Sequence, residues 1–367
     1  MFGAQRKGKI INMKVAVILG DNIHRAPYYY RYEKWLCDNH IDFDVIMWNR
    51  EKVKENCKGN LIEFIMADEG NNKNPLKVFK FFAFSHFVKK TVKKKIYDKV
   101  IFLGLTGCAV TLEIAFFKKY YNKKYWLDIR DYHYEWFKPY YWLEKQAIDN
   151  AYFVALSSKG FERFLPKHAY GYIHNIDPNM KDICAKFAKT SSDRIRISFI
   201  GNVRYYNENV ALINSLKNDD RFLLQYFGPG SKKIAEYCKD NNIENVHFEG
   251  PFKAEQTRGF YEKTDIINNV YGNTTLETLT ALSNKLYYSI YLRLPIMVSP
   301  GTFMETVCKP YNIAVSYINC EDFADRLFEW YCFRINSGAD LDYQNLQREV
   351  EQEDIAVQER FVEFIAK

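Results

Sequence analysis

Two polar segments of this sequence carry residue types that could act on a substrate. The first spans residues 128–133, reads Asp-Ile-Arg-Asp-Tyr-His, and directly follows the apolar run 124–127. Ligands of open α/β sheets bind at the carboxyl ends of the strands, so these side chains belong to a ligand-binding edge. A carboxylate or an imidazole at that edge can take the proton of a hydroxyl group. We therefore predict Asp131 and His133 as catalytic residues.

Three further charged residues belong to the same predicted edge. Asp128 and Arg130 lie within the segment, and Asp21 follows an earlier apolar run, residues 14–19. We predict that they contact the substrate that supplies the hydroxyl group. Arg130 could instead pair with one of the aspartates and have a structural role.

The second polar segment surrounds Lys285, in the first turn of a helix that the spacing predicts from Ser283 or Asn284 to about residue 292. Either Ser283 or Asn284 can cap the helix N-terminus. A lysine there opposes the helix dipole, and a bound anion such as a diphosphate would compensate for that cost. The alternative is a surface lysine that buries only its aliphatic stem.

A third feature is the loop after the apolar run 196–200. Gly201 permits a close approach of the backbone to a ligand, and Arg204 offers a permanent cation whose geometry matches phosphate.

These residues are positioned by two α/β halves in series, because short buried-strand runs alternate with helical patterns along the whole chain. The predicted strands cover residues 14–19, 42–48, 99–103, 124–127 and 151–156, then 196–200, 222–226, a short strand within 246–252, 296–298 and 314–317. A polar, lysine-bearing stretch separates the halves, and an amphipathic acidic helix spans residues 343–366. The predicted organisation is an extension (1–12), a first domain (13–177), a linker (178–193), a second domain (194–340) and a C-terminal helix (341–367).

A basic segment between residues 77 and 99 contains eight lysines and one acid in a chain of net charge +7. Its apolar positions 78, 81, 82, 88 and 92 share one helical face, with further aromatic residues beside it. Such a helix suits contact with an anionic membrane surface, although a packed helix with a solvated lysine face explains the same pattern. No recognisable nucleic-acid-binding module accompanies the charge. The residues predicted to touch a membrane are Lys77, Phe81, Phe82, Lys89, Lys90, Lys93 and Lys94.

Composition excludes several other classes. The eight cysteines contain no Cys-x-x-Cys pair, so we expect neither a zinc site nor a disulfide framework, and a reducing compartment fits. No apolar run approaches the roughly 18 residues of a membrane span. Asp42-x-Asp44 lies at the start of a predicted strand and is better explained as a solvated edge than as a metal site.

Several of these motifs together resemble a known enzyme family. Ser-Asn-Lys-Leu-Tyr (283–287), six residues and then Leu-Pro-Ile (294–296) look like the donor-site segment of bacterial glycosyltransferases of the GT-B architecture. The close relatives build capsules, O-antigens and related surface polysaccharides. Residues 128–131 are similar to the acceptor-side motif of that family, and Gly-x-x-Arg-Tyr-Tyr (201–206) is typical of its capsule-type subgroup. Tyr288 stands where many relatives have a glutamate that binds the donor ribose.

The resemblance implies two Rossmann-like domains whose parallel sheets face a central cleft, and a C-terminal helix that crosses back to the first domain. It also implies sugar transfer from a nucleotide-diphosphate-sugar to a glycan or lipid-linked oligosaccharide acceptor, without a metal or cofactor. The expected location is cytoplasmic, peripheral to the anionic inner face of the plasma membrane, with no nucleic-acid partner. The residues implied to bind the donor are Gly201, Asn202, Arg204, Tyr271, Asn273, Asn284 and Lys285.

Two other classes stay open. A catalytically silent protein that binds nucleotide-sugars or glycans is compatible with Tyr288 in place of the glutamate. A nucleotide-sugar epimerase of the same architecture would isomerise the donor without an acceptor, but it would have no use for a membrane-facing helix.

Overall fold

The computed structural model describes residues 13–68, 76–104, 107–336 and 340–367. These residues form two compact units. The first consists of the chain up to Ser157 together with Phe164–Ile173 and Asp354–Lys367, and the second consists of Ser158–Arg163 and His174–Glu353. The predicted extension, residues 1–12, lies outside the described residues.

The first unit is built on a sheet whose seven described strands are all parallel. The strand β1 (Lys14–Leu19) is the apolar run KVAVIL and is almost completely buried, as expected for a parallel strand covered on both faces. In spatial order the strands are β3 (Asn60–Ile65), β2 (Asp42–Asn49), β1 (Lys14–Leu19), β4 (Lys99–Leu103), β5 (Tyr125–Ile129), β6 (Phe153–Leu156) and β7 (Gly171–Tyr172).

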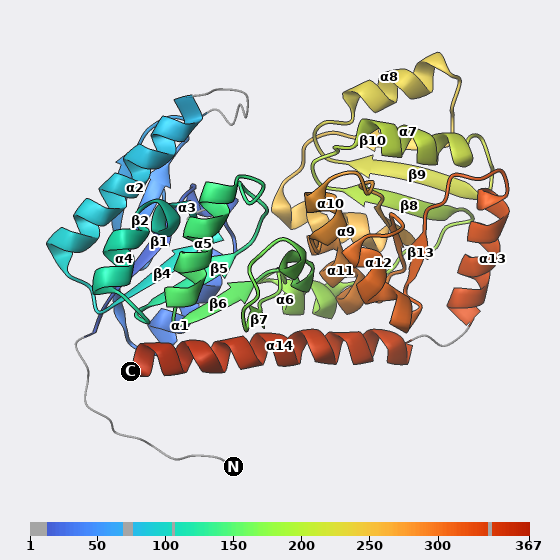
Figure 1. Cartoon of the computed structure of the whole chain (residues 1–367). Helices are drawn as coiled ribbons and strands as arrows, with labels where there is room; N and C mark the ends of the chain where they lie inside the picture. Colours follow the sequence, from blue (N-terminus) through green and yellow to red (C-terminus); the bar gives the residue numbers. More distant parts are fainter. Residues whose placement is uncertain (1–12, 69–75, 105–106, 337–339) are drawn as a thin grey trace, which may run out of the picture. The chain divides into compact units, whose positions relative to one another are not determined.

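Helices cover both faces of this sheet (Figure 1). One layer contains α2 (Leu76–Lys95), α3 (Gly107–Leu112), α4 (Ile114–Tyr120) and α5 (Lys138–Asn150), which contact one another in turn. The other face is covered by α1 (Tyr29–Asp38) and by the last part of α14 (Asp340–Ala366). Phe361 and Phe364 of α14 pack there with Trp126 of β5 in one apolar core. The predicted C-terminal helix is thus confirmed.

The basic helix α2 extends over the predicted residues, but its buried face differs from the predicted one. Phe81, Phe84, Val88 and Val92 are buried, at the spacing of one helical stripe. Val78 and Phe82, which were predicted on that face, are about half exposed, at 50% and 54%. The side chain of Lys77 lies outside the described residues. Lys89 pairs with Glu113 at 2.8 Å, whereas Lys90, Lys93 and Lys94 are exposed.

The second unit repeats the design around a smaller parallel sheet of six described strands. In spatial order they are β10 (Val246–Glu249), β9 (Phe222–Phe227), β8 (Ile195–Ile200), β11 (Ile266–Asn269), β12 (Ile296–Val298) and β13 (Ala314–Ser316). The helices are α6 (Met180–Lys186), α7 (Tyr206–Ser215), α8 (Lys232–Asp240), α9 (Thr257–Glu262), α10 (Leu276–Thr280), α11 (Asn284–Leu292), α12 (Phe303–Cys308) and α13 (Phe323–Asn336). The described residues also include four short 3-10 turns, which are η1 (Ile23–Arg25), η3 (Lys159–Arg163), η4 (Ala254–Gln256) and η5 (Lys309–Tyr311).

Two local differences from the sequence prediction have simple causes. Strand β3 was not predicted, because it lies at the sheet edge and its residues are half-buried rather than continuously apolar. The sequence predicts one helix from about residue 109 to 121, whereas the structure has two helices, α3 and α4. They are separated at Glu113, whose backbone leaves the helical region. Among the described residues, no helix has both the length and the apolar character that crossing a bilayer requires.

Candidate functional site

The predicted charged residues of the first unit gather around Tyr28, which the sequence did not single out. Strands β1, β4 and β5 are parallel neighbours, so the segments that follow β1 and β5 lie at one edge of the sheet. The Arg130 guanidinium lies over the Tyr28 ring, with its carbon 4.2 Å from the ring centroid. Burial raises the pKa of Tyr28, the Arg130 charge opposes the shift, and the charges of Asp128, Asp131 and Asp21 add to it. The charges of four predicted residues, Asp21, Asp128, Arg130 and Asp131, therefore act on the Tyr28 side chain.

Asp128 and Arg130 form a buried ion pair at this edge. The guanidinium donates to Asp128 Oδ2 from Nε at 3.1 Å and from Nη2 at 2.7 Å. The Tyr32 hydroxyl donates to the same carboxylate oxygen at 2.8 Å, and Asp128 is only 1% exposed. The internal pairing that the sequence left open is thus present. The pair fixes the position of the Arg130 backbone and hence of the loop that begins at Asp131.

Asp131 and His133 differ sharply in environment. Asp131 is exposed, whereas the His133 side chain is only 8% exposed and its Nε2 is buried without a hydrogen-bond partner among the described residues. Burial lowers the pKa of His133 to about 4, a backbone hydrogen bond at Asp131 partly opposes this, and the Arg50 charge adds to it. His133 is therefore neutral near pH 7. Of the two predicted catalytic residues, Asp131 is the one that a solvent-borne hydroxyl can reach.

Two buried glutamates, Glu135 and Glu144, support this loop, and neither was predicted as a site residue. Glu135 accepts a hydrogen bond from the His133 backbone N–H at 2.6 Å. Burial raises the pKa of Glu135 and raises that of Glu144 on α5 to about 9, with the Glu135 charge adding to the second shift. Glu144 is therefore a neutral acid near pH 7. Glu144 shares the buried face of α5 with Tyr140, Ala147 and Ile148. A carboxyl group on an otherwise apolar helix face is the sequence signal that could have revealed Glu144.

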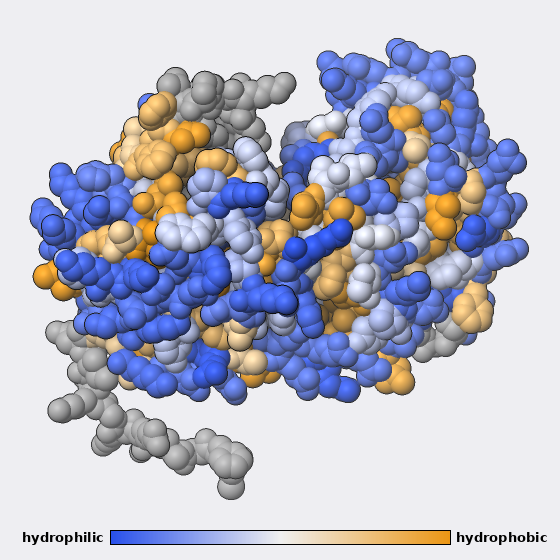
Figure 2. All heavy atoms as spheres, viewed as in Figure 1, coloured by the Kyte–Doolittle hydropathy of each residue, from blue (hydrophilic) through white to orange (hydrophobic). Residues whose placement is uncertain are grey.

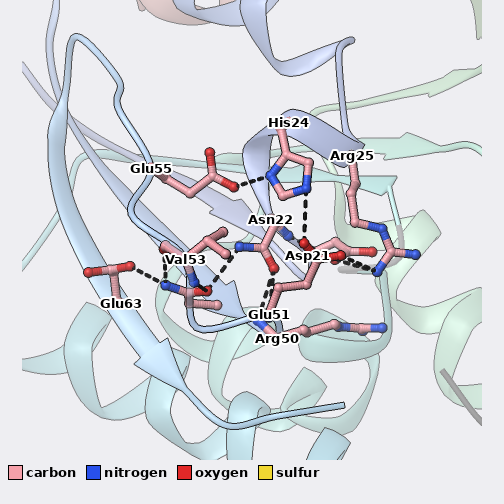
Figure 3. Close-up of polar contacts among 10 residues, drawn as sticks. Asp21, Asn22, His24, Arg25, Arg50, Glu51, Val53, Glu55 and Glu63 are labelled. Atoms are coloured by element: carbon pink, nitrogen blue, oxygen red, sulfur yellow. Dashed lines mark hydrogen bonds and ion pairs between the residues drawn. The ribbon is translucent and has the colours of Figure 1, made fainter. Parts of the chain in front are cut away.

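Asp21 belongs to a second polar cluster at the carboxyl ends of β1 and β2 (Figure 3). Its carboxylate accepts from the Asn22 backbone N–H at 2.8 Å. The buried Asn22 side chain donates to Asn49 at 2.9 Å and accepts from the backbone of Arg50 and Glu51. His24 contacts Glu51 at 3.1 Å and Glu55 at 2.6 Å. These contacts tie two loops into one rigid support at the predicted ligand edge.

In the second unit, the loop after β8 is held in place by glycines and an asparagine. Gly201 adopts φ +123°, and a Cβ added at Gly228 would lie 2.1 Å from the Gly201 carbonyl oxygen. The two loops therefore pass too close for a side chain at residue 228. Asn209 donates to the carbonyls of Arg204 and Tyr205 at 2.8 and 2.9 Å. The Arg204 side chain is left exposed at the edge of the sheet.

Lys285 is buried beside that loop. Ser283 caps helix α11 by accepting from the Lys285 N–H at 3.3 Å. Lys285 is only 4% exposed, so the alternative of a surface lysine is wrong. Its Nζ donates to the Asn268 carbonyl at 2.9 Å and lies 3.2 Å from the centroid of the Phe199 ring. Burial lowers the pKa of Lys285 well below its ordinary value, and the Arg204 charge lowers it further.

Lys285 and Arg204 together form a site that favours an anion. Among the described residues, neither side chain makes an ion pair with a carboxylate. Two nearby cations without a counter-charge repel each other, and a bound anion would relieve this. Arg204 lies in the loop after β8, and Lys285 of helix α11 reaches the Asn268 carbonyl in the neighbouring strand β11. The carboxyl edge of such a sheet is where α/β folds bind phosphates.

The other predicted donor residues lie around these cations or on the same edge. Tyr271 stacks on Tyr205 with ring centroids 4.7 Å apart, and its ring centroid is 5.1 Å from Lys285 Nζ. Asn273 is exposed and donates to the Pro300 carbonyl at 2.9 Å. Asn202 and Asn284 are exposed as well.

Tyr288 shows what replaces the glutamate of the resembling family. Its ring stacks on Tyr261 with centroids 4.3 Å apart, and its hydroxyl donates to Asp177 at 2.5 Å. Tyr288 is buried at 8% exposure. The residue at this position is therefore bonded to a carboxylate, that of Asp177, which comes from a different segment of the chain.

Known proteins resemble this chain in structure rather than in sequence. No protein-family model matches the sequence, and no curated protein matches it. Solved structures do match. Sucrose-phosphate synthase from Thermosynechococcus elongatus superposes with a TM-score of 0.69 at 12% identity, over 96% of this chain and 99% of that one. The fold is that of the GT-B glycosyltransferases.

Two other structures extend the comparison. HepE of Anabaena, solved in complex with UDP, matches with a TM-score of 0.65 at 11% identity over 96% of this chain and 100% of that one. WaaG, a glycosyltransferase involved in lipopolysaccharide biosynthesis, matches with a TM-score of 0.55 at 11% identity over 92% and 95%. At such low identities the likeness establishes the GT-B fold, in agreement with the two parallel-sheet units.

Proposed function

We propose that this protein is a glycosyltransferase that moves a sugar from a nucleotide-diphosphate-sugar to a hydroxyl group of a glycan. The observation that carries the proposal is the buried Lys285 beside Arg204, at the carboxyl edge of the second sheet. A buried cation is costly unless it meets a negative charge, and it concentrates its field on an anion held in the same place. The UDP bound by HepE, which shares the fold, supports a nucleoside diphosphate as that anion.

In the proposed reaction, the bond between the anomeric carbon and the diphosphate oxygen breaks and its electron pair stays on the diphosphate. Lys285 and Arg204 stabilise this charge, and an oxocarbenium-like sugar forms. The acceptor oxygen then bonds to the anomeric carbon. Its proton passes to Asp131, the exposed carboxylate at the edge of the first sheet. The proposal includes no metal or cofactor, because the two cations take the role that a metal has at other diphosphates.

The finer parts of the proposal concern the acceptor and the location. We propose a lipid-linked acceptor in the biosynthesis of a surface polysaccharide such as a capsule or an O-antigen. The enzyme would act in the cytoplasm at the inner face of the plasma membrane, with the exposed lysines of α2 toward anionic lipid. WaaG, with the same fold, is described as acting in lipopolysaccharide biosynthesis, which supports this choice.

A second candidate is a catalytically silent protein that only binds the nucleotide-sugar. The hydrogen bond from Tyr288 to Asp177 favours it, because the position where relatives hold the ribose carries a phenol already bonded within the protein. An epimerase of the same fold has no observation of its own in its favour.

The experiment is a thermal-shift titration with UDP, GDP, ADP and CDP, followed by a donor-turnover assay with the sugar-linked form of the best binder. A ligand that binds only the folded state raises the unfolding midpoint. We expect a shift with one nucleotide that is lost in Lys285→Ala, and sugar release or transfer that is lost in Asp131→Asn. Binding without any turnover would favour the silent protein. No shift with any nucleotide at millimolar concentration would refute the donor site.

A further inference from the structure

An apolar pocket of about 410 Å³ opens in the first unit between α2, α3, α5 and the loop after β5. Its wall is hydrocarbon and aromatic throughout, without a polar atom at its surface. The volume is that of a small-molecule site, but such sites normally place a few polar groups to orient a ligand. This pocket therefore suits a purely apolar ligand segment. Six of its lining residues are Phe81, Phe82, Leu112, Tyr134, Trp136 and Leu143.

The pocket has an exposed aromatic rim. Phe82, Trp136 and Phe137 line it and remain 54%, 70% and 50% exposed. Figure 2 shows apolar side chains gathered over the upper part of α2 and the region of α3. Contiguous apolar surface of this kind marks a binding site more often than it occurs by chance on a soluble protein.

The same helix provides a charge that complements an anionic headgroup. Helix α2 carries no aspartate or glutamate, and its later turns expose Lys90, Lys93 and Lys94. Figure 2 shows hydrophilic side chains over that lower end of α2, next to the apolar region. Helix α2 thus has an apolar end at the pocket and a cationic end beyond it, a pattern typical of helices that contact anionic lipid.

The pocket is also continuous with the candidate acceptor residues. The loop that contains Asp131 and His133 continues directly into Tyr134, Trp136 and Phe137, three residues that line the pocket. Tyr134 packs edge-on against Phe81 of α2, with ring centroids 6.3 Å apart, and against Tyr140 of α5 at 5.7 Å. Asp131 thus lies three residues before Tyr134, the first lining residue of this loop.

We propose that this pocket binds the hydrocarbon tail of the lipid-linked acceptor and so positions the glycan for transfer. The inference rests on the proposed function, and it makes the lipid a recognised part of the substrate rather than only an anchor. Tail binding lowers the entropic cost of placing the acceptor hydroxyl at Asp131.

The test measures binding of n-alkyl phosphates with 6, 8, 10 and 12 carbons (roughly the size range that a pocket of this class holds) by calorimetry, at concentrations where each compound is monomeric. Each added methylene is expected to tighten binding about fourfold. The affinity should then stop rising once the tail fills the pocket. Partition into a micelle or bilayer has no such limit, so a plateau identifies a pocket of finite volume.

Two tryptophans of similar exposure provide the matched variants. Trp136 lines the pocket and is 70% exposed, whereas Trp142 on α5 is 62% exposed and does not line it. Trp136→Asp is expected to weaken decyl phosphate binding at least tenfold, and Trp142→Asp to leave it within twofold. Both side chains are exposed, so neither variant should unfold the unit, which circular dichroism verifies. Leu143→Trp, which fills the pocket, should also abolish binding.

Three outcomes overturn the proposal. The wild-type protein could bind phosphatidylglycerol vesicles but no monomeric alkyl phosphate. This result would mean that the aromatic rim enters a bilayer and that the pocket is not a tail site. Sedimentation that shows a dimer which Phe82→Asp dissociates assigns the patch to a second copy. Equal weakening by Trp136→Asp and Trp142→Asp means non-specific adsorption.

The outcome is separable from that of the proposed function. Nucleotide binding is measured with UDP and Lys285→Ala in the second unit, and alkyl phosphate binding with Trp136→Asp in the first. Alkyl phosphate binding without any nucleotide binding would leave the tail site intact and refute the glycosyltransferase. Sugar transfer from the nucleotide-sugar to a soluble acceptor, without alkyl phosphate binding, would support the glycosyltransferase and refute the tail site.

Discussion

Replacement of Lys285 by methionine should weaken diphosphate binding without destabilising the protein. The methionine side chain fills nearly the same volume but carries no charge. In the wild type, the ammonium makes one hydrogen bond to the Asn268 carbonyl at 2.9 Å and lies over the Phe199 ring. A charged hydrogen bond contributes ~1.5–3 kcal/mol and a desolvated cation–π contact ~2 kcal/mol, whereas burial of an ion costs several kcal/mol. We therefore expect Lys285→Met to change the unfolding free energy at pH 7 by between zero and a gain of ~2 kcal/mol.

The pH dependence gives this expectation a sign. Burial lowers the pKa of Lys285 in the folded protein, so the unfolded chain binds more protons between that lowered pKa and the ordinary 10.5. Wild-type stability therefore rises with pH across this interval through Lys285. The variant lacks the titration, so its advantage should be largest at neutral pH and disappear as the pH approaches 10.5. Urea unfolding at pH 7 and pH 10 measures both values.

Binding should change in the opposite direction. Loss of a charged contact to phosphate of ~2–3 kcal/mol raises the Kd for the nucleoside diphosphate roughly 30- to 150-fold. Calorimetry with the best nucleotide measures this value. Lys232→Met is the control, because Lys232 also begins a helix, α8, but is 90% exposed. A Lys285→Met protein that loses more than ~2 kcal/mol of stability yet binds the nucleotide normally would show that the lysine only supports the fold.

Three further predictions concern other residues. Burial raises the pKa of Glu144 to about 9, so the folded state holds a proton that the unfolded chain releases above its ordinary 4.5. The free energy of unfolding therefore falls as the pH rises between these values. Glu144→Gln should gain ~1–3 kcal/mol at pH 8, and its free energy of unfolding in urea should depend less on pH. Gly228→Ala should lower the free energy of unfolding more than Gly201→Ala, because its Cβ would lie 2.1 Å from a backbone oxygen. A Cβ at Gly201 meets nothing within 4 Å, so that variant should lose only the ~1–3 kcal/mol of backbone strain. Equal losses in the two variants would mean that the loops separate freely. Asp131→Asn should lower turnover roughly 10²- to 10⁴-fold with nucleotide affinity unchanged, and unchanged turnover would remove Asp131 as the base.

Local sequence patterns were enough to predict most of the elements that carry the site. The apolar runs at β1, β4 and β5 are buried strands, and helix α11 begins at the Ser283 cap and ends at Leu292 as the spacing predicts. These features depend on neighbours within one or two turns, so periodicity and capping encode them directly. The positions of Lys285 in the first turn of α11 and of Asp131 after β5 follow from the same patterns.

The sequence therefore determined two α/β halves with charged residues at the carboxyl ends of their strands. Only the tertiary structure decided what those residues do. It buried Lys285 of helix α11 against Phe199 of strand β8, paired Asp128 with Tyr32, and joined Tyr288 to Asp177. Such partners are many residues apart in the chain, and no local period links them. Burial and pairing set the charge state of a side chain, so its chemistry becomes defined only when the sheets assemble and exclude water.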